Sequence, residues 1–353
     1  MRIILIILDG CAVTSLKDAP TPFFDRILEE GVGDLNCKAV FPTATYTGHS
    51  SIITGCYPNK TGMVANQYYD REQKISKHFD NYDPNIHIEM PTIFEYLKKL
   101  RPISISEPVF KGAYDYVSMK EVNKKSPQLR NEIIYNLTLK YLKNENIKFI
   151  MINFSAVDSI GEIYSPNSNK YKEELEKVDK YIENIYNISK KTNDTLLIIT
   201  ADHGLTDIKS YYNLQDDLLN NGLNTICLNS HRIAHLYVQQ SEKNDLISFL
   251  KNNKKIKHVF YGNKINELKV EHKRTGDLIV VAEDKVELEV KGLKGSHGGL
   301  NIEEITVPLL FFGIESLQFE LKNSKIIDIL PTILNILKIQ VKNRLDGKSL
   351  LIK

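Results

Sequence analysis

Residues 195–203 read TLLIITADH, an apolar run that ends in Asp202 and His203. The run is typical of a strand buried on both faces of a parallel sheet. Open α/β sheets hold their ligands beyond the carboxyl ends of their strands, and both Asp and His bind divalent metals. The stretch therefore predicts an α/β fold with a metal site at one sheet edge, whereas an isolated Asp-His pair would indicate only a loop or a helix cap.

The same arrangement recurs elsewhere in the chain. The apolar run 3–8 ends in Asp9, and the run 149–154 is followed by Asp158. His297 lies in a glycine-rich loop just before another apolar segment. Because the carboxyl ends of parallel strands meet at one edge, these separated segments are expected to bring their side chains into one ligand set.

Composition limits the protein class. The chain has 353 residues, 42% of them hydrophobic, which suits one large domain or a domain with an insertion. Its 46 basic and 44 acidic residues nearly cancel, and its apolar runs are far shorter than the ~18 residues of a spanning helix. We therefore expect no specific nucleic-acid binding, no association with a membrane and a cytoplasmic location. The four cysteines show no C-x-x-C spacing, so we expect them to be reduced.

Strand-like runs alternate with amphipathic stretches, which predicts a mainly parallel sheet sandwiched by helices. Between residues 209 and 292 the pieces are shorter and more charged, which predicts a small inserted α+β cap. The catalytic core would then comprise residues 1–208 and 293–353. Helices are expected over residues 22–30, 91–100, 130–143 and 171–189.

The chemistry of the ligand set indicates phosphoryl transfer. A cluster of Asp and His without Cys suits zinc, manganese or iron, and its negative charge favours two cations. Two such ions ~4 Å apart stabilise the attacking and leaving oxygens of a displacement at phosphorus. Thr45 is the candidate nucleophile, because a helix from about Tyr46 would place it where helix N-termini favour an oxyanion. The alternative is that Thr45 is only an N-cap residue.

Several motifs resemble the alkaline phosphatase superfamily, and most closely its nucleotide pyrophosphatase/phosphodiesterase branch. They occur in the expected order along nearly the whole chain: Asp9, Thr21 to Gly31, Pro42-Thr43-x-Thr45, Thr54-Gly-x-Tyr-Pro58, Asp158, Asp202-His203-Gly204, His297-Gly298, Asp328-Ile329-x-Pro331-Thr332 and Asp346-Gly347. The resemblance implies an alkaline phosphatase-like core.

The resemblance also implies roles for particular residues. Thr45 would form a covalent phospho-threonine intermediate and would share one metal with Asp9, Asp202 and His203. Asp158, Glu162 and His297 would hold a second metal, which activates water. Asn66 would act with Thr45 in catalysis and bind the substrate by donating to a phosphate oxygen.

Two departures from the family pattern affect these expectations. Glu162 occupies the histidine position of the Asp-x-x-Gly-His motif, so the second metal gains a harder ligand. Zinc is expected overall, with manganese or iron as alternatives at the Asp158, Glu162 and His297 site; Glu162 as a solvated helix residue is the other interpretation. Thr47-Gly48 replaces the Pro-Asn common in the branch.

Arg232 is a second candidate for substrate binding, since a guanidinium suits oxyanions, and a structural arginine is the alternative. His49, His231 and His235 are candidates for the edge of the site or for structural roles.

The predicted function is metal-dependent hydrolysis of phosphodiester or pyrophosphate bonds in a small phosphorylated substrate such as a nucleotide. The alternatives are a phosphomonoesterase or a phosphonate hydrolase on the same core. Either would need extra cationic groups for a dianion, and Arg232 is the candidate cation. A non-catalytic binding protein is disfavoured because the nucleophile and the ligands are all present.

Overall fold

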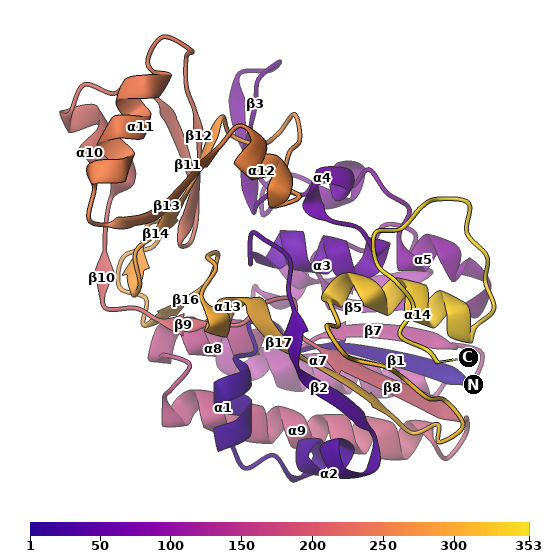
Figure 1. The fold of residues 1–353 in the computed structure, drawn as a ribbon. Helices are drawn as coiled ribbons and strands as arrows, with labels where there is room; N and C mark the ends of the chain where they lie inside the picture. The colour runs from indigo at the N-terminus through magenta and orange to yellow at the C-terminus, as the bar shows by residue number, and fades with distance from the viewer. Residues whose placement is uncertain (353) are drawn as a thin grey trace.

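A computed structural model describes residues 1–352 and centres on a seven-stranded sheet of order β2-β17-β8-β1-β7-β5-β6 (Figure 1). β1, β8, β7, β5 and β6 are mutually parallel, whereas β17 runs antiparallel to both β8 and β2. In sheet order the strands are β2 (Val32–Lys38), β17 (Thr306–Phe312), β8 (Thr195–Thr200), β1 (Arg2–Ile7), β7 (Phe149–Asn153), β5 (Ile103–Glu107) and β6 (Asp115–Ser118).

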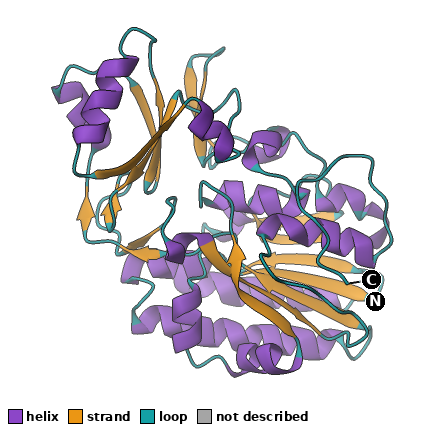
Figure 2. Ribbon diagram, viewed as in Figure 1, coloured by secondary structure: helices purple, strands orange, loops and turns teal. Residues whose placement is uncertain are grey.

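Helices cover both faces of this sheet, as Figure 2 shows. One layer packs around the long helix α9 and contains α1 (Val13–Asp18), α2 (Pro22–Glu30), α7 (Pro127–Leu142), α8 (Ala156–Tyr164) and α9 (Asn169–Ser189). The opposite layer packs around α3 and contains α3 (Thr45–Thr54), α4 (Pro58–Thr61), α5 (Ile93–Tyr96) and α14 (Ile329–Ile336). The predicted α/β sandwich is confirmed, and α2 has the predicted bounds.

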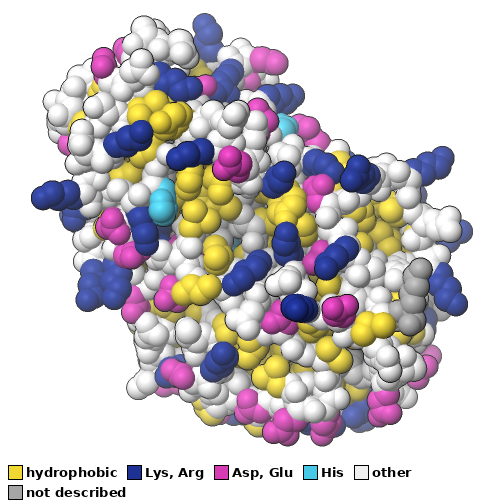
Figure 3. Space-filling view, in the orientation of Figure 1, with side chains coloured by type: hydrophobic (Ala, Val, Ile, Leu, Met, Phe, Trp, Pro, Cys, Tyr) yellow, Lys and Arg dark blue, Asp and Glu magenta, His cyan; other side chains and the backbone are white. Residues whose placement is uncertain are grey.

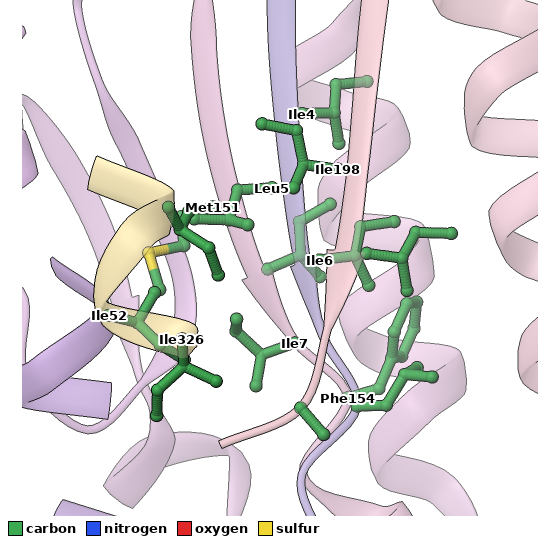
Figure 4. Packing of buried hydrophobic residues seen from close by; sticks show 14 of the residues in the cluster. Ile4, Leu5, Ile6, Ile7, Ile52, Met151, Phe154, Ile198 and Ile326 are labelled. Carbon is green, nitrogen blue, oxygen red and sulfur yellow. The ribbon is translucent and has the colours of Figure 1, made fainter. Parts of the chain in front are cut away.

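The central strands are buried on both faces because the two helix layers exclude water from them. Every residue from Ile3 to Leu8 is fully buried. Figure 4 shows Ile52 of α3 and Met151 of β7 among the side chains that pack beside β1. Full burial of one such side chain stabilises the fold by roughly 1.5–3 kcal/mol, so the core holds the carboxyl edge of the sheet rigidly.

Residues in the predicted cap form their own antiparallel sheet of order β11-β12-β14-β13 with its own apolar cluster. Short strand pairs connect it to the core, β9 (Thr206–Asp207) with β16 (Gly295–Ser296) and β10 (Ser210–Tyr211) with β15 (Val286–Glu287). The other elements are β11 (Ile226–Ser230), β12 (Ile233–Tyr237), β13 (Ile256–Tyr261), β14 (Leu278–Ala282), α10 (Leu214–Asn220), α11 (Lys243–Asn252) and α12 (Asn263–Glu267). The domain boundaries at 208 and 293 stay a prediction.

A core hairpin reaches the cap, since β3 (Gln67–Asp70), paired with β4 (Ile75–His78), contacts β11. The remaining short elements are α6 (Met119–Val122), α13 (Ile302–Ile305) and the 3₁₀ turns 84–86, 98–100 and 326–328. Acidic and basic side chains are interspersed on the visible surface (Figure 3), in keeping with the small net charge. Within residues 1–352 no helix combines the length and apolarity needed to cross a membrane.

Candidate active site

The predicted ligands meet at the carboxyl edge of the sheet. Asp9 and Asp202 each lie two residues beyond a parallel strand, β1 and β8, and Asp158 lies in the first turn of α8 after β7. His297 precedes β17 in the chain. Because β17 is antiparallel to β8, its amino-terminal end lies at the same edge as the carboxyl ends of the others.

One cluster contains Asp9, Asp202 and His203 beside Thr45. His203 Nε2 lies 3.2 Å from Asp202 Oδ2, 3.9 Å from Asp9 Oδ1 and 3.4 Å from Thr45 Oγ1. The other oxygen of each carboxylate is fixed, because Asn153 Nδ2 donates to Asp9 Oδ2 and the Gly10 N–H donates to Asp202 Oδ1. The free oxygens therefore face one shared point, as ligands of one cation would.

Thr45 is the first residue of α3, and the N-cap position belongs to Ala44. No side chain in the described part of the chain caps this helix end, so the alternative that Thr45 is an N-cap residue is wrong. The hydroxyl instead lies at the positive end of a ten-residue helix, where the backbone dipoles favour a negatively charged oxygen. This position suits a nucleophile that must lose its proton.

A second cluster contains Asp158, Glu162, His231 and His297. The ligand atoms of Glu162, His231 and His297 all lie within 4.8 Å of one another, as do those of Asp158, His203 and His297. Asp158 and Glu162 lie one turn apart on α8, so both carboxylates can reach the same side of the helix. Glu162 lies beside the predicted ligands and is only 18% exposed, so the interpretation of it as a solvated helix residue is wrong.

Both predicted imidazole ligands are held in the tautomer that a metal needs. His203 Nδ1 contacts the Gly204 carbonyl at 3.1 Å, and His297 Nδ1 contacts the Thr43 carbonyl at 2.7 Å. A carbonyl only accepts, so each Nδ1 carries the proton and each Nε2 keeps its lone pair. Burial lowers the pKa of His203 to about 4 and that of His297 well below its usual value, so both rings are neutral at pH 7.

The chemistry of the two clusters fits divalent cations. Four carboxylate oxygens are buried and have no hydrogen-bond partner among residues 1–352: Asp9 Oδ1, Asp158 Oδ1, Glu162 Oε1 and Asp202 Oδ2. Burial, followed by the charges of neighbouring carboxylates, raises the pKa of Asp158 and of Asp202 well above the usual range. Buried oxygens of like charge are costly unless a cation offsets them, so the donor set is that of a metal site.

Asn66 lies beside Thr45, although it comes from the segment before β3. Its Oδ1 accepts a hydrogen bond from the Tyr46 backbone N–H at 3.3 Å, and its backbone N–H donates to Ser230 Oγ at 3.1 Å. With Oδ1 occupied, the amide nitrogen Nδ2 is the group left to donate. Asn66 is 8% exposed and lines the site cavity, where a phosphate oxygen can accept that bond.

The clusters open into a cavity of about 270 Å³. Its walls combine the site residues with aromatic and polar side chains from both parts of the chain, including Tyr46, His78, Asp80, Met119, Asn123, Glu289 and Val290. No Lys or Arg of residues 1–352 lines this cavity. A dianionic phosphate monoester therefore finds no permanent cation among the side chains that surround it.

Arg232 does not line the cavity, which corrects its prediction as a substrate-binding residue. Its side chain is fully buried, and its guanidinium donates to Glu304 and to the backbone carbonyls of Val286 and Glu283. Glu304 in turn accepts from the Gly299 N–H at 2.8 Å. A buried guanidinium with these partners is structural, as the alternative interpretation held, and it fixes the loop that carries His297.

Sequence reasoning gave His49 no definite role. Its Nδ1 lies 2.7 Å from Glu107 Oε2, and its Nε2 lies 3.8 Å from Asp9 Oδ2 and 3.6 Å from Asp202 Oδ2. The available signal was its spacing four residues after Thr45, which places both on one side of a helix. His235 lies in the cap, where its Nδ1 accepts from the Gly276 N–H at 3.3 Å, so it is structural.

The departure at Gly48 has a steric explanation. A Cβ atom at this position would lie 2.7 Å from the Asp202 carbonyl oxygen and 2.8 Å from the Asp202 Cβ. In this structure the absence of a Cβ at Gly48 lets α3 approach the loop after β8 this closely. The approach brings Thr45 to His203.

A mainly parallel sheet with Asp and His clusters and a helix-borne Thr at its carboxyl edge defines the alkaline phosphatase-like class. The sequence model of a protein family, described as type I phosphodiesterase / nucleotide pyrophosphatase, matches residues 3–300. The chain therefore belongs to this family. The predicted resemblance is thereby confirmed.

Curated relatives are similar over part of their length. Human bis(5'-adenosyl)-triphosphatase ENPP4 is 29% identical over 232 residues, 62% of this chain and 49% of its own. Rat ectonucleotide pyrophosphatase/phosphodiesterase family member 7 is 25% identical over 226 residues, 59% of this chain and 50% of its own. The chain thus spans about half the length of the curated relatives it matches.

Solved structures share the fold. Murine ectonucleotide pyrophosphatase / phosphodiesterase 5 aligns over 100% of both chains with a TM-score of 0.82 and 20% identity, and it has also been solved in an inactive form with AMP. Phosphonoacetate hydrolase from Sinorhizobium meliloti 1021 aligns over 94% of both chains with a TM-score of 0.77 and 18% identity. The alkaline phosphatase PafA aligns over 99% of this chain and 98% of its own with a TM-score of 0.82 and 15% identity. At these identities the likeness shows the fold alone, and the alkaline phosphatase-like fold is confirmed.

Proposed function

We propose that this protein is a two-metal phosphodiesterase that cleaves phosphodiester or pyrophosphate bonds of small nucleotides through a phospho-threonine intermediate on Thr45. The observation that carries the proposal is the position of Thr45 Oγ1. It lies at the N-terminus of α3 and 3.4 Å from His203, and it lines the cavity together with Asp9, Asp158 and His297. The membership in a family of phosphodiesterases supports it.

Each residue of the site has a task in this reaction. Asp9, Asp202 and His203 would hold one divalent cation with Thr45, and Asp158, Glu162 and His297 would hold the other. When bound, such ions lower the pKa of a hydroxyl or a water and stabilise the charge on oxygens at phosphorus. Zinc is the expected metal, with manganese or iron as alternatives at the Asp158 site.

The Thr45 oxygen attacks phosphorus as the ester oxygen leaves, so that the substrate's phosphoryl group becomes bonded to Thr45. Asn66 Nδ2 donates to a non-bridging oxygen of that group and stabilises the charge that develops on it. Water then breaks the Thr45–phosphorus bond and regenerates the hydroxyl. The charge on the transferred group stays close to that of a monoanion, which suits a cavity that no Lys or Arg in the described part of the chain lines.

Nucleotides are the proposed substrate class. The relative ENPP4 is named a bis(5'-adenosyl)-triphosphatase, and the structural neighbour of murine origin was solved with AMP. Tyr46 lines the cavity directly beside Thr45, and its hydroxyl donates to Asp80 at 2.9 Å, so the ring is fixed in place. A base of the substrate can contact the part of this ring that borders the cavity.

The test compares hydrolysis of bis-p-nitrophenyl phosphate and p-nitrophenyl phosphate by purified protein titrated separately with zinc and manganese. We expect the diester to be cleaved faster, and activity to be lost in Thr45→Ala and to fall strongly in Asp202→Asn. Thr45→Ser, which keeps a hydroxyl, is the matched control. A faster monoester reaction would move the assignment to a phosphatase, and unchanged activity in Thr45→Ala would overturn the mechanism.

A further inference from the structure

The second ligand cluster has an irregular composition. Where the family motif supplies an Asp and a His from one helix, α8 supplies Asp158 and Glu162. His297 is then the single imidazole among the residues that the motifs assign to this cation. Two carboxylates and one imidazole form a harder donor set than the zinc-typical one.

An additional imidazole reaches the same cluster from the cap. His231 lies in the two-residue turn between β11 and β12, far from α8 in sequence. Its Nδ1 lies 3.5 Å from Glu162 Oε1, and its ring centroid lies 4.1 Å from that of His297. His231 also lines the site cavity. It therefore stands on the cap side of the point where Glu162 and His297 meet.

The facing atoms of His231 and Glu162 are both unsatisfied. His231 Nδ1 and Glu162 Oε1 are buried, and neither has a hydrogen-bond partner within residues 1–352. Native proteins pair nearly all buried polar atoms, so an unpaired set that converges on one point indicates an absent ligand. A cation coordinated by both atoms would satisfy both.

The backbone at His231 also indicates a functional constraint. His231 has a φ of +57°, in the left-handed region, at a turn position that favours Gly or Asn. Its N–H donates to Glu289 Oε2 at 2.6 Å, and the next N–H, that of Arg232, donates to the His297 carbonyl at 2.9 Å. The turn is thus tied directly to the loop that carries another ligand. Strained positions of this kind concentrate at functional sites.

We propose that His231 is a ligand of the second metal and supplies, from the cap, the imidazole that the Asp158-x-x-Gly-Glu162 motif lacks. This inference rests on the proposed two-metal function. The complete donor set is then Asp158, Glu162, His231 and His297, two carboxylates and two imidazoles. His231 and His297 then supply two nitrogen ligands, the number that the family motif provides with a histidine at position 162. The cap becomes part of the metal centre.

The competing explanation is an ion pair. His231 Nδ1 also lies 3.8 Å from Glu287 Oε1, so a protonated ring could bridge Glu162 and Glu287. The two explanations predict opposite effects on metal binding. Removal of a ligand weakens binding of the second cation, whereas removal of a positive charge beside it leaves binding unchanged or makes it tighter.

The experiment measures binding of zinc and manganese alone to the full-length protein, by calorimetric titration and by metal content after gel filtration. His231→Asn is the main variant, because Asn tolerates a left-handed backbone better than other side chains. His258→Asn is the matched control, since His258 lies on β13 in the same cap sheet and outside the cavity. The double variant Glu162→His with His231→Asn returns an imidazole to the family position.

We expect two bound metals in the wild type and in the His258→Asn control. In His231→Asn the affinity of the weaker site for zinc should fall at least 10-fold, because even loss of an outer partner of a ligand costs about 10–100-fold. The double variant should recover the second zinc ion, which shows that the loss is not a folding defect. The cobalt-substituted protein should lose absorbance intensity in His231→Asn and regain it in the double variant.

If His231→Asn binds two metal ions as tightly as the wild type, or more tightly, this inference is overturned and the proposed function stays intact. A wild type that binds only one metal would instead contradict the two-metal function itself. The two failures are therefore distinguished by the wild-type stoichiometry.

Discussion

Replacement of Gly48 by Ala tests how rigidly the site is held. The new Cβ would lie 2.7 Å from the Asp202 carbonyl oxygen, whereas ordinary contact begins at 3.4 Å. The helix α3 and the loop after β8 must therefore separate by about 0.7 Å, the difference between these two distances. Thr45 is on the helix, and Asp202 and His203 are on the loop, so the separation opens the site itself.

The effects on stability and on activity should differ. Overpacking costs about 1–3 kcal/mol, but Ala in place of a helical Gly returns about 1 kcal/mol. The net loss in free energy of unfolding is then about 0–2 kcal/mol. A displacement of ~1 Å in a catalytic geometry can cost ~10²-fold in rate. We expect kcat for bis-p-nitrophenyl phosphate to fall about 10-fold or more at saturating metal.

The assay measures kcat, metal content and the thermal midpoint for Gly48→Ala beside the wild type. Ser51→Ala is the control on the same helix, because the Ser51 hydroxyl is buried and the described residues give it no hydrogen-bond partner. It removes an atom from α3 without moving Thr45, so its kcat should match the wild type. Wild-type kcat in Gly48→Ala with full metal content would refute the argument that this close approach sets the catalytic geometry.

Three further predictions concern single side chains. Asn66→Ala should lower kcat/KM for the diester by about 10²–10³-fold with unchanged metal content, as loss of one transition-state donor does; an effect on KM alone would show uniform substrate binding instead. Arg232→Ala should lower the free energy of unfolding by about 3–5 kcal/mol because it leaves the Glu304 carboxylate buried and unpaired, and urea unfolding checks this; an altered KM with full stability would restore Arg232 as a substrate ligand. Burial lowers the pKa of His235 to about 3 in the folded protein. As the pH falls below about 6.5, His235 therefore takes up a proton in the unfolded chain but not in the folded one, and the free energy of unfolding falls by about 1.4 kcal/mol per pH unit. This fall should be smaller in His235→Asn, as urea titrations at pH 7 and pH 5 would show, and an identical pH dependence would contradict it.

The sequence predicted the parts of the site that follow directly from strand order. Asp9, Asp158 and Asp202 each come just after an apolar run, and parallel strands bring such positions together whatever the rest of the chain does. The central sheet and its helix layers follow from the same alternation. The cytoplasmic location and the roles of the individual site residues stay predictions.

The parts that the sequence left open, among them the choice between a site-edge and a structural role for His231, depend on contacts between distant segments. His231 and Arg232 are neighbours in one turn, yet the first lines the cavity and the second is fully buried against Glu304. A left-handed residue in a two-residue turn reverses the chain, so adjacent side chains take different environments. The chemistry of a guanidinium predicted that Arg232 binds the substrate. In the structure Arg232 is instead buried beside the Glu304 carboxylate.

The charge of the complete site favours a diester over a monoester. Asp9, Asp158, Glu162 and Asp202 bring four negative charges when ionised, and two divalent cations offset all four, while neutral imidazoles add none. Ionisation of Thr45 then leaves the centre with one excess negative charge, and among the described residues 1–352 no Lys or Arg lines the cavity to compensate. Two unit charges 4 Å apart interact by about 4 kcal/mol near a protein surface, so each additional negative charge on the substrate weakens its binding.

A histidine at position 162 would remove one carboxylate and relax this constraint. Glu162→His should therefore shift the metal preference toward zinc and, in the same protein, raise the rate on p-nitrophenyl phosphate relative to the diester. An unchanged substrate ratio together with a changed metal preference would show that local charge does not set the choice of substrate.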